Sequence, residues 1–220
     1  MRGIVLDTCT ERGVVAIVEG TNIIFQAQLP FGLQNAQFLL PTLQAGLKDA
    51  SIELNTLAYI ATGVGPGSYT GIRVGVTVAK TLAFACRMPI VGICTLDVFV
   101  PDNEGSFAVV IDAKIGGIYM QTGIKHGGGR FEVTSDPMVC TLDEGAKRLE
   151  HIPTIVTPNA EKIRLKFAQL TGCAWMESAP SCERLAELAQ IKLRAGNHER
   201  FELLYMRKTQ AELEKKMERA

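Results

Sequence analysis

The glycine-rich stretch at 65–75, GPGSYTGIRVG, constrains the fold of this chain more than any other segment. It lies between an apolar run at 57–64, which predicts a buried strand, and an apolar run at 71–86, which predicts a long helix. Glycine and proline at this density indicate a backbone that most residues cannot adopt. Ser68 or Thr70 is expected to cap the helix. The stretch therefore predicts a tight strand-to-helix turn, which serves either close packing or the binding of an anion.

The helix predicted after this turn carries a seam of small side chains. Gly71, Gly75, Ala79 and Ala83 are spaced four residues apart, so they share one face of the helix. Such a face allows another helix to approach closely. Most of the remaining positions are apolar, which indicates a helix covered on several sides. In a chain of 220 residues, we expect part of that cover to come from another protein.

Charge and cysteine usage exclude several classes of protein. The formal net charge is zero, so the chain lacks the basic footprint of a protein that binds nucleic acid unaided. Six cysteines are spread without a CxxC pair, which predicts free thiols in a reducing compartment instead of a disulfide framework or zinc site. Asp7 ends the N-terminal apolar run early, and Lys80 and Arg87 interrupt the longest one. We expect a soluble cytoplasmic protein without a membrane segment.

Hydrophobic periodicity predicts two successive α/β blocks, separated by a polar break at 101–105. In the first block, strands are expected at 3–6, 14–19, 23–28, 57–64 and 90–94, and helices at 39–50 and 71–86. Pro41 predicts that the helix at 39–50 either starts near Leu39 or is kinked there. In the second block, strands are expected at 107–111, 118–123, 131–133, 138–140, 155–156 and 203–206, and helices after Thr141 (a capping box with Glu144), at 160–170, at 182–195 and in the charged tail 209–220.

The two blocks open in the same way, with an apolar strand, an aspartate, a tight turn and a second strand. The segments VLDTCTERGVVAIV and VIDAKIGGIYMQTG can be aligned on this pattern. The repeat predicts two related lobes, 1–104 and 105–220, in a two-lobed actin/hexokinase/Hsp70-like (ribonuclease-H-like) α/β fold with mixed sheets flanked by helices. In proteins of that fold, the two hairpins face the phosphates of ATP across a cleft.

One alternative function is that of an autonomous ATP-dependent small-molecule kinase or ATPase of this fold, with Asp7 and Asp112 flanking magnesium-bound ATP. The plainer interpretation is that each aspartate accepts hydrogen bonds from its own turn. No candidate for an adenine pocket is evident between Thr154 and Gly196. A P-loop is excluded because the glycine stretches lack the lysine that it requires, and a dinucleotide-binding GxGxxG is incomplete.

The stretch GPGSYTGIRVGVTVAKTLAF, at 65–84, closely resembles the signature segment of the bacterial TsaB (YeaZ) proteins. The segments LDTCT, LLPTL, PIVGICTL, VIDAKIGGIYMQT and LLYMRK agree with that family in the same order, so the resemblance covers nearly the whole chain. TsaB proteins belong to the machinery that makes threonylcarbamoyladenosine in tRNA. They are similar to its catalytic subunit, TsaD.

The resemblance implies a pseudo-enzyme that binds and activates TsaD, which transfers the threonylcarbamoyl group to the adenosine next to the anticodon of ANN-decoding tRNAs. It implies no catalytic residue, no metal site and no cofactor of its own, with ATP or ADP and magnesium held only at the partner interface of the assembled complex. The ATPase TsaE and, through the complex, tRNA are the other implied partners. Because family members also self-associate, a self-dimerising scaffold is a further alternative. His126, His151 and His198 agree with the absence of a metal, because no two of them have the spacing of helical ligands.

Two sets of residues follow as candidate sites. The partner interface is expected on the two helices of the first block, through Leu39, Leu40, Leu43, Leu47, Gly71, Gly75, Ala79, Leu82 and Ala83. A nucleotide shared with the partner is expected near Gly65, Pro66, Gly67, Ser68, Thr70, Gly71 and Arg73. In the tail, Lys215, Lys216 and Arg219 could contact tRNA, but the interleaved glutamates favour a solvated helix.

The chain departs from the pattern of the family at two places. Asn35, Ala36 and Gln37 stand where relatives often carry His-Ser-Glu, and the run Lys114–Gly117 stands where they often carry Arg-x-Gly-Glu. The loss of these ionisable groups weakens the case for chemistry at both places. It also affects any polar contact with a partner that these positions would make.

Overall fold

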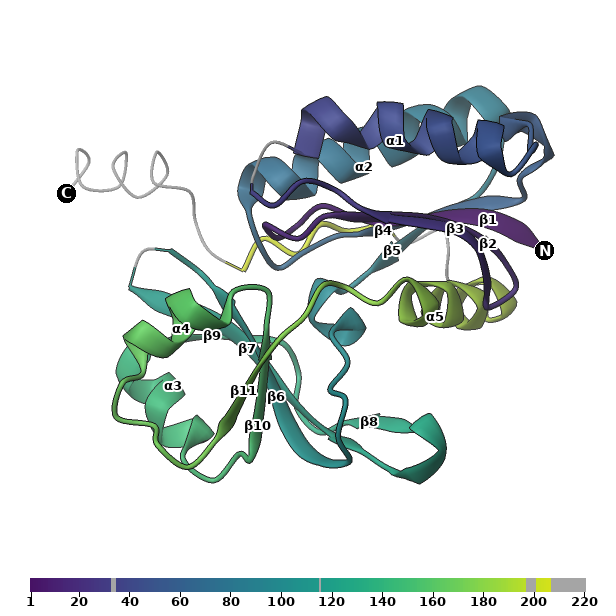
Figure 1. Cartoon of the computed structure of the whole chain (residues 1–220). Helices are drawn as coiled ribbons and strands as arrows, with labels where there is room; N and C mark the ends of the chain where they lie inside the picture. The colour runs from purple at the N-terminus through teal and green to yellow at the C-terminus, as the bar shows by residue number, and fades with distance from the viewer. Residues whose placement is uncertain (33–34, 115, 197–200, 207–220) are drawn as a thin grey trace, which may run out of the picture.

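A computed structural model describes residues 1–32, 35–114, 116–196 and 201–206 of the chain. In this part of the chain, two mixed β-sheets form two lobes, and helices cover the sheets (Figure 1). None of the helices described is long and apolar enough to cross a membrane.

The first sheet has the strand order β3-β2-β1-β4-β5. Its strands are β1 (Arg2–Asp7), β2 (Val14–Glu19), β3 (Asn22–Gln28), β4 (Tyr59–Gly63) and β5 (Ile90–Ile93). The first three strands form an antiparallel meander, whereas β4 and β5 extend the sheet in parallel with β1. All five strands predicted in the first block are thus confirmed, with ends that shift by one or two residues.

The second sheet repeats this arrangement. Its order is β11-β10-β6-β7-β8, with β9 also paired to β7. Its strands are β6 (Gly105–Asp112), β7 (Gly117–Lys125), β8 (Phe131–Val133), β9 (Met138–Thr141), β10 (Thr154–Thr157) and β11 (Ala174–Glu177). As in the first sheet, the opening hairpin is antiparallel and the later strands add in parallel to its first strand. The two related lobes predicted from the repeated hairpin are therefore confirmed at the level of strand order.

In the second block, one strand was not predicted and one predicted strand is wrong. The strand β11 has four residues, and its short segment AWME gave no signal that was recognised in the sequence. Residues 203–206 form no strand, although the Leu204 amide donates a hydrogen bond to the carbonyl of Val64 at 2.9 Å. The side chains of Leu203 and Leu204 instead pack against a small core cluster beside the glycine turn.

The helices follow the predicted periodicity, with differences at their ends. They are α1 (Asn35–Asp49), α2 (Tyr69–Cys86), α3 (Leu142–Leu149), α4 (Ala160–Lys166) and α5 (Cys182–Arg194), with 3-10 turns η1 (Leu54–Thr56), η2 (Thr95–Val98) and η3 (Gly127–Gly129). Of the two alternatives predicted for the first helix at Pro41, a start near Leu39 is wrong. The helix begins at Asn35 and continues through Pro41, because Leu39 and Leu43 on either side of the proline are buried against the sheet. The predicted helix at 160–170 ends early, at Lys166.

Both predicted helix caps are confirmed. The Ser68 side chain accepts a hydrogen bond from the Gly71 amide at the start of α2. Thr141 and Glu144 form a reciprocal capping box at the start of α3. The helical tail predicted at 209–220, with Lys215, Lys216 and Arg219, lies outside the described residues.

The helices lie in layers on the sheets. Helices α1 and α2 cover one face of the first sheet, and α5 covers the opposite face (Figure 1). Helices α3 and α4 pack on the second sheet. The predicted division into 1–104 and 105–220 separates the two sheets, but it assigns α5 to the wrong lobe. The sequence of α5 follows the second sheet, and yet Leu185, Ala186 and Ala189 pack in the core of the first lobe.

Candidate functional site

The two repeated hairpins place one aspartate each at the end of the first strand of a lobe. Asp7 ends β1 and has no exposure to solvent. Its carboxylate accepts hydrogen bonds from the Cys9 amide at 2.7 Å and from the Thr95 hydroxyl at 2.8 Å. Burial raises the pKa of the Asp7 carboxyl, while the amide of Cys9 and the hydroxyl of Thr95 act in the opposite direction. Asp7 is therefore buried inside the first lobe, where its hydrogen bonds stabilise the turn that follows β1.

Asp112, the equivalent residue of the second lobe, lies in a basic environment. Its carboxylate oxygens are 2.6 Å from the ammonium groups of both Lys162 and Lys166, and one oxygen accepts the Lys114 amide at 2.8 Å. Burial alone would raise the pKa of Asp112, but the hydrogen bonds from the two lysines and the amide outweigh it and lower that pKa. The carboxylate is thus ionised, and both of its oxygens are occupied.

A cavity of about 240 Å³ lies where the two lobes meet. The first lobe lines it with Glu11, Phe31 and Ser68, and the second lobe lines it with Asp112 and neighbouring basic side chains. This is the place at which the predicted kinase would hold magnesium-bound ATP. Since Asp112 is paired with two lysines and Asp7 is sealed, the described residues offer no free carboxylate pair for magnesium here. No group of three or more histidine, cysteine or acidic side chains suited to a metal occurs in the described residues.

A cross-lobe contact holds one side of this cavity. Arg12, in the turn between β1 and β2, donates to the Pro158 carbonyl at 2.6 Å and forms an ion pair with Glu177. Glu177 in turn accepts the Ala160 amide at the start of α4, at 2.9 Å. The Arg12 guanidinium also lies over the Phe31 ring, 5.1 Å from its centroid. These contacts fix the spacing of the two lobes.

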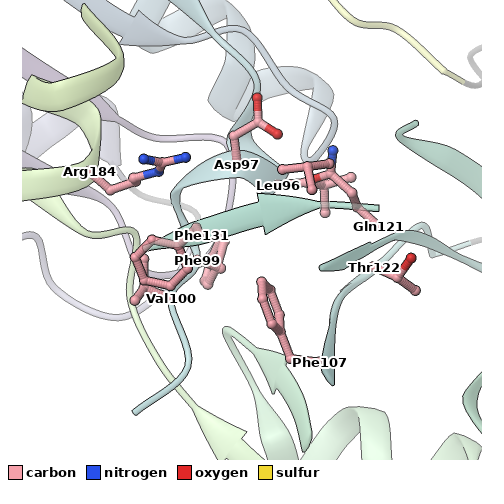
Figure 2. A pocket seen from close by; sticks show the side chains of 10 residues that line it. Leu96, Asp97, Phe99, Val100, Phe107, Gln121, Thr122, Phe131 and Arg184 are labelled. Atoms are coloured by element: carbon pink, nitrogen blue, oxygen red, sulfur yellow. The ribbon is translucent and has the colours of Figure 1, made fainter. Parts of the chain in front are cut away.

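Figure 2 shows a second, smaller pocket at the junction of the lobes, where the phenylalanines 99, 107 and 131 lie below Asp97. Its volume is about 10 Å³, which is the space of one water molecule and too small for a substrate. Burial raises the pKa of Asp97, against a hydrogen bond with Gln121 and the positive charge of Arg184. The pocket is a packed junction between the lobes.

The glycine turn packs directly on the first hairpin. The Ser68 amide donates to the Cys9 carbonyl at 2.7 Å, and the Thr8 hydroxyl donates to the Gly71 carbonyl at 2.7 Å. A Cβ atom at Gly67 or Gly71 would collide with the carbonyl of Cys9 or Thr8. Close packing therefore accounts for these two glycines, as the plainer interpretation of the turn predicted.

The residues predicted to lie near a nucleotide differ in their exposure to solvent. Gly65, Pro66 and Gly71 are buried, and Gly67 and Ser68 are half-buried. Thr70 and Arg73 are exposed at the start of α2. The Arg73 guanidinium lies 3.9 Å from the centroid of the Tyr69 ring, and its Nε donates to the Tyr205 hydroxyl at 3.3 Å.

Most of the residues predicted as a partner interface lie inside the first lobe. Six of the nine are buried: Leu39, Leu43, Gly71, Gly75, Ala79 and Ala83. The seam of small side chains was correctly placed on one face of α2, but it meets the sheet of its own lobe, so these six cannot contact a partner in this conformation. Leu40 is 49% exposed, and Leu47 and Leu82 are half-buried.

Other side chains on the outer face of these helices are apolar and exposed. Phe84, on α2, is 88% exposed, and Phe38, on α1, is 36% exposed. The sequence prediction missed both, because it followed the small-residue spacing of α2 and the leucines of α1. Phe84 follows Lys80 by four residues, so it lies on the polar face of the helix, away from the seam of small side chains. A search of that face for large apolar residues would have found it.

The repeated sheet order and the paired hairpins define the class of this protein as a two-lobed α/β protein of the actin/hexokinase type. Two solved structures share its fold. YeaZ from Pseudomonas aeruginosa superposes with a TM-score of 0.72 at 22% identity, over 90% of this chain and 95% of that one. A P. aeruginosa protein described as similar to peptidase YEAZ superposes with a TM-score of 0.75 at 22% identity, over 94% of this chain and 99% of that one.

Sequence comparison identifies the family to which the chain belongs. The sequence model of the family described as TsaD, tRNA N6-adenosine threonylcarbamoyltransferase, matches residues 34–197. The chain belongs to that family, and within it to the TsaB/YeaZ proteins. The proteins named tRNA threonylcarbamoyladenosine biosynthesis protein TsaB include one from Escherichia coli, 31% identical over 138 residues (58% of this chain), and one from Haemophilus influenzae, 29% identical over 203 residues (85% of this chain and 84% of the relative). The match spans 59% of the length of the E. coli relative and 56% of that of the Buchnera aphidicola relative.

Proposed function

We propose that this chain is a non-catalytic subunit in the synthesis of threonylcarbamoyladenosine in tRNA, which binds and activates a TsaD-type catalytic subunit. The names of its curated relatives support the process. The observation that carries the partner role is the outer face of α1 and α2, where Phe84 and Leu40 are exposed. Large apolar side chains left in water on packed helices are typical of a surface that another protein covers.

The state of the two hairpin aspartates supports a role without chemistry. A magnesium-bound nucleotide needs carboxylate oxygens that are free to bind the metal. Asp7 has no exposed surface, and Asp112 is paired with Lys162 and Lys166. The autonomous kinase is therefore the less favoured function.

The partner surface is tested by placing charge on it without disturbing the core. In Leu40→Asp/Phe84→Asp, both changes lie at exposed positions, so we expect normal folding but binding to the TsaD-type subunit weakened about 30-fold or more, as for the loss of an interface anchor. The matched control is Ile191→Asp, an exposed apolar residue on α5, across the sheet. Calorimetry of the pair measures both variants. Unchanged affinity in the double variant would reject this surface.

A nucleotide with magnesium at the assembled interface is the second part of this proposal. The start of α2 supports it, because Arg73 and Thr70 are exposed beside the capped helix end. Calorimetry of ADP binding to the assembled pair tests it, and we expect Arg73→Ala to weaken binding. An unchanged ADP affinity in Arg73→Ala would show that Arg73 only braces Tyr69 and Tyr205.

The remaining partners are a TsaE-type ATPase and tRNA, both reached through the complex. A self-dimer that uses the same face of α1 and α2 is the competing proposal. Size-exclusion chromatography with and without the TsaD-type subunit discriminates between them. If the self-dimer is a resting form, the added subunit should dissociate it. A dimer that persists beside unbound TsaD-type subunit would favour the scaffold.

A further inference from the structure

Residues 201–206, which we call the strap, lie against the glycine turn and the start of α2 (yellow in Figure 1). The Leu204 amide donates a hydrogen bond to the Val64 carbonyl at 2.9 Å. The Leu204 carbonyl lies so close to Gly65 that a Cβ atom there would come within 2.9 Å of its oxygen. The apolar side chains of the strap pack on a small buried cluster formed by Cys9, Val64, Ile72 and Val76. The strap therefore joins the end of the described chain to the glycine turn of the first lobe.

The aromatic end of the strap holds Arg73. The Tyr205 ring packs on the Tyr69 ring, with 4.9 Å between the centroids, and the Tyr205 hydroxyl accepts a hydrogen bond from Arg73 Nε at 3.3 Å. The Arg73 guanidinium also lies 3.9 Å from the centroid of the Tyr69 ring. Arg73 is an exposed cation in the first turns of α2, where a helix favours negative charge. The strap and any anion that approaches this helix end therefore compete for the same guanidinium.

The strap is held more weakly than the elements around it. None of its six residues, all of them described, is buried, and they form no helix or strand. A cavity of about 230 Å³ lies between the strap, β5 and α5, and its lining residues are Val64, Gly92, Cys94, Lys192, Glu202 and Leu204. Partly buried contacts beside a cavity are features of a segment that opens locally while the rest of the domain stays folded.

We infer that the strap is a releasable device, which opens while the first lobe stays folded and thereby frees Arg73 and exposes Cys94 at the same time. In the closed form Tyr205 holds Arg73, and Leu204 lines the cavity beside Cys94. Because linkage is reciprocal, a ligand that takes Arg73 from Tyr205 favours the open strap, and the open strap favours that ligand. The opening is a property of the isolated chain, so it can be measured without a partner.

Cys94 reports on the opening, because it is half-buried in the wall of the cavity while the strap is closed. Burial raises the pKa of the Cys94 thiol to about 12, so the closed form reacts slowly with thiol reagents. Cys182, buried in the core of the first lobe, reports on unfolding of the whole lobe instead. The experiment is alkylation of the full chain with iodoacetamide under native conditions, in which mass spectrometry of the peptides follows each cysteine separately.

Leu204→Ala removes a side chain that holds the strap on the lobe. We expect alkylation of Cys94 to be about tenfold faster in this variant, with the rate at Cys182 unchanged, because only the strap is destabilised. The matched control is Leu165→Ala, which truncates an exposed leucine on α4 and should leave the Cys94 rate unchanged. No acceleration at Cys94 in Leu204→Ala, or an equal acceleration at Cys94 and Cys182, would overturn the inference.

A second set of variants tests the hold on Arg73 at a distance from the cavity. Tyr205→Phe deletes only the hydroxyl that accepts from Arg73, and neither residue lines the cavity at Cys94. We expect Tyr205→Phe and Arg73→Ala each to accelerate Cys94 alkylation about threefold, and the double variant to be no faster than Arg73→Ala, because both changes remove the same hydrogen bond. Arg164→Ala, at an exposed arginine on α4, is the control and should change nothing. Unchanged Cys94 rates in both single variants, or effects that multiply in the double variant, would show that Arg73 does not hold the strap and would reject its release as the event that frees Arg73.

Discussion

Asp7 and Asp112 occupy equivalent places in the two repeated hairpins, but their surroundings shift the pKa of the carboxyl group in opposite directions. Asp7 is buried among neutral donors, whereas Asp112 lies between two lysines. The sequence predicted that each aspartate would accept hydrogen bonds from its own turn, and this is confirmed by the amides of Cys9 and Lys114. The lysines of Asp112 come from 50 or more residues further along the chain, so the hairpin alone could not reveal them.

The opposite environments predict opposite effects of the same substitution. The folded pKa of Asp7 is raised, so its stabilising contribution is present at low pH and is lost as pH rises above about 4. Asp7→Asn should therefore be more stable than the wild type at pH 7, and should lose that advantage at acidic pH. Urea unfolding at pH 7 and below pH 4 measures the difference.

Asp112→Asn is the matched control for this prediction. The folded pKa of Asp112 is lowered, so its contribution is present above the unfolded pKa and is lost as pH falls through the folded pKa. Asp112→Asn should accordingly destabilise the protein at pH 7, because Lys162 and Lys166 lose their partner. A loss of stability in Asp7→Asn at pH 7 would mean that the charge of Asp7 stabilises the fold, against this account.

At the scale of elements, α2 shows what periodicity can and cannot predict. The spacing of Gly71, Gly75, Ala79 and Ala83 correctly predicts a face of small side chains. It cannot predict the neighbour of that face, because a helix and a sheet impose the same demand for close approach. In the structure the neighbour is the sheet beneath, so a charge at Ala79, which is fully buried, would disrupt the core of the lobe before it tested an interface.

The packing of this face predicts the effect of a single methyl group. A Cβ at Gly75 would lie 2.5 Å from the Thr8 hydroxyl oxygen and 3.2 Å from Leu6 Cδ1. Alanine favours a helix over glycine by about 1 kcal/mol, but overpacking typically costs 1–3 kcal/mol. We expect Gly75→Ala to lower the free energy of unfolding by on the order of 1 kcal/mol. Thr77→Ala, at an exposed position of α2, is the control and should be neutral or slightly stabilising. A more stable Gly75→Ala would show that this face of α2 can accommodate an additional methyl group without strain.

At the scale of the whole molecule, the repeated hairpin predicted two lobes with the same strand order, and the structure agrees. Two features depend on contacts between distant segments and escaped prediction. The helix α5 returns to the first sheet after the second sheet is complete, and the cavity joins Glu11 to Lys114 and Lys162. Neither leaves a local signal, because an amphipathic helix or a polar loop residue is compatible with either lobe.

The return of α5 predicts that a residue near the end of the described chain stabilises its beginning. Leu185 is fully buried against the first sheet, whereas Ile163, on α4, is buried in the core of the second. Leucine or isoleucine to alanine in a core costs about 2–5 kcal/mol. We expect Leu185→Ala to lower hydrogen-exchange protection chiefly in β1 and β5, and Ile163→Ala to lower it chiefly in β6 and β10, because cooperative units follow packed cores and not sequence order. Loss of protection in β6 and β10 upon Leu185→Ala, with β1 and β5 unaffected, would assign α5 to the second lobe energetically. Selective loss in the first sheet would instead mean that the first lobe is completed only after the second has been synthesised.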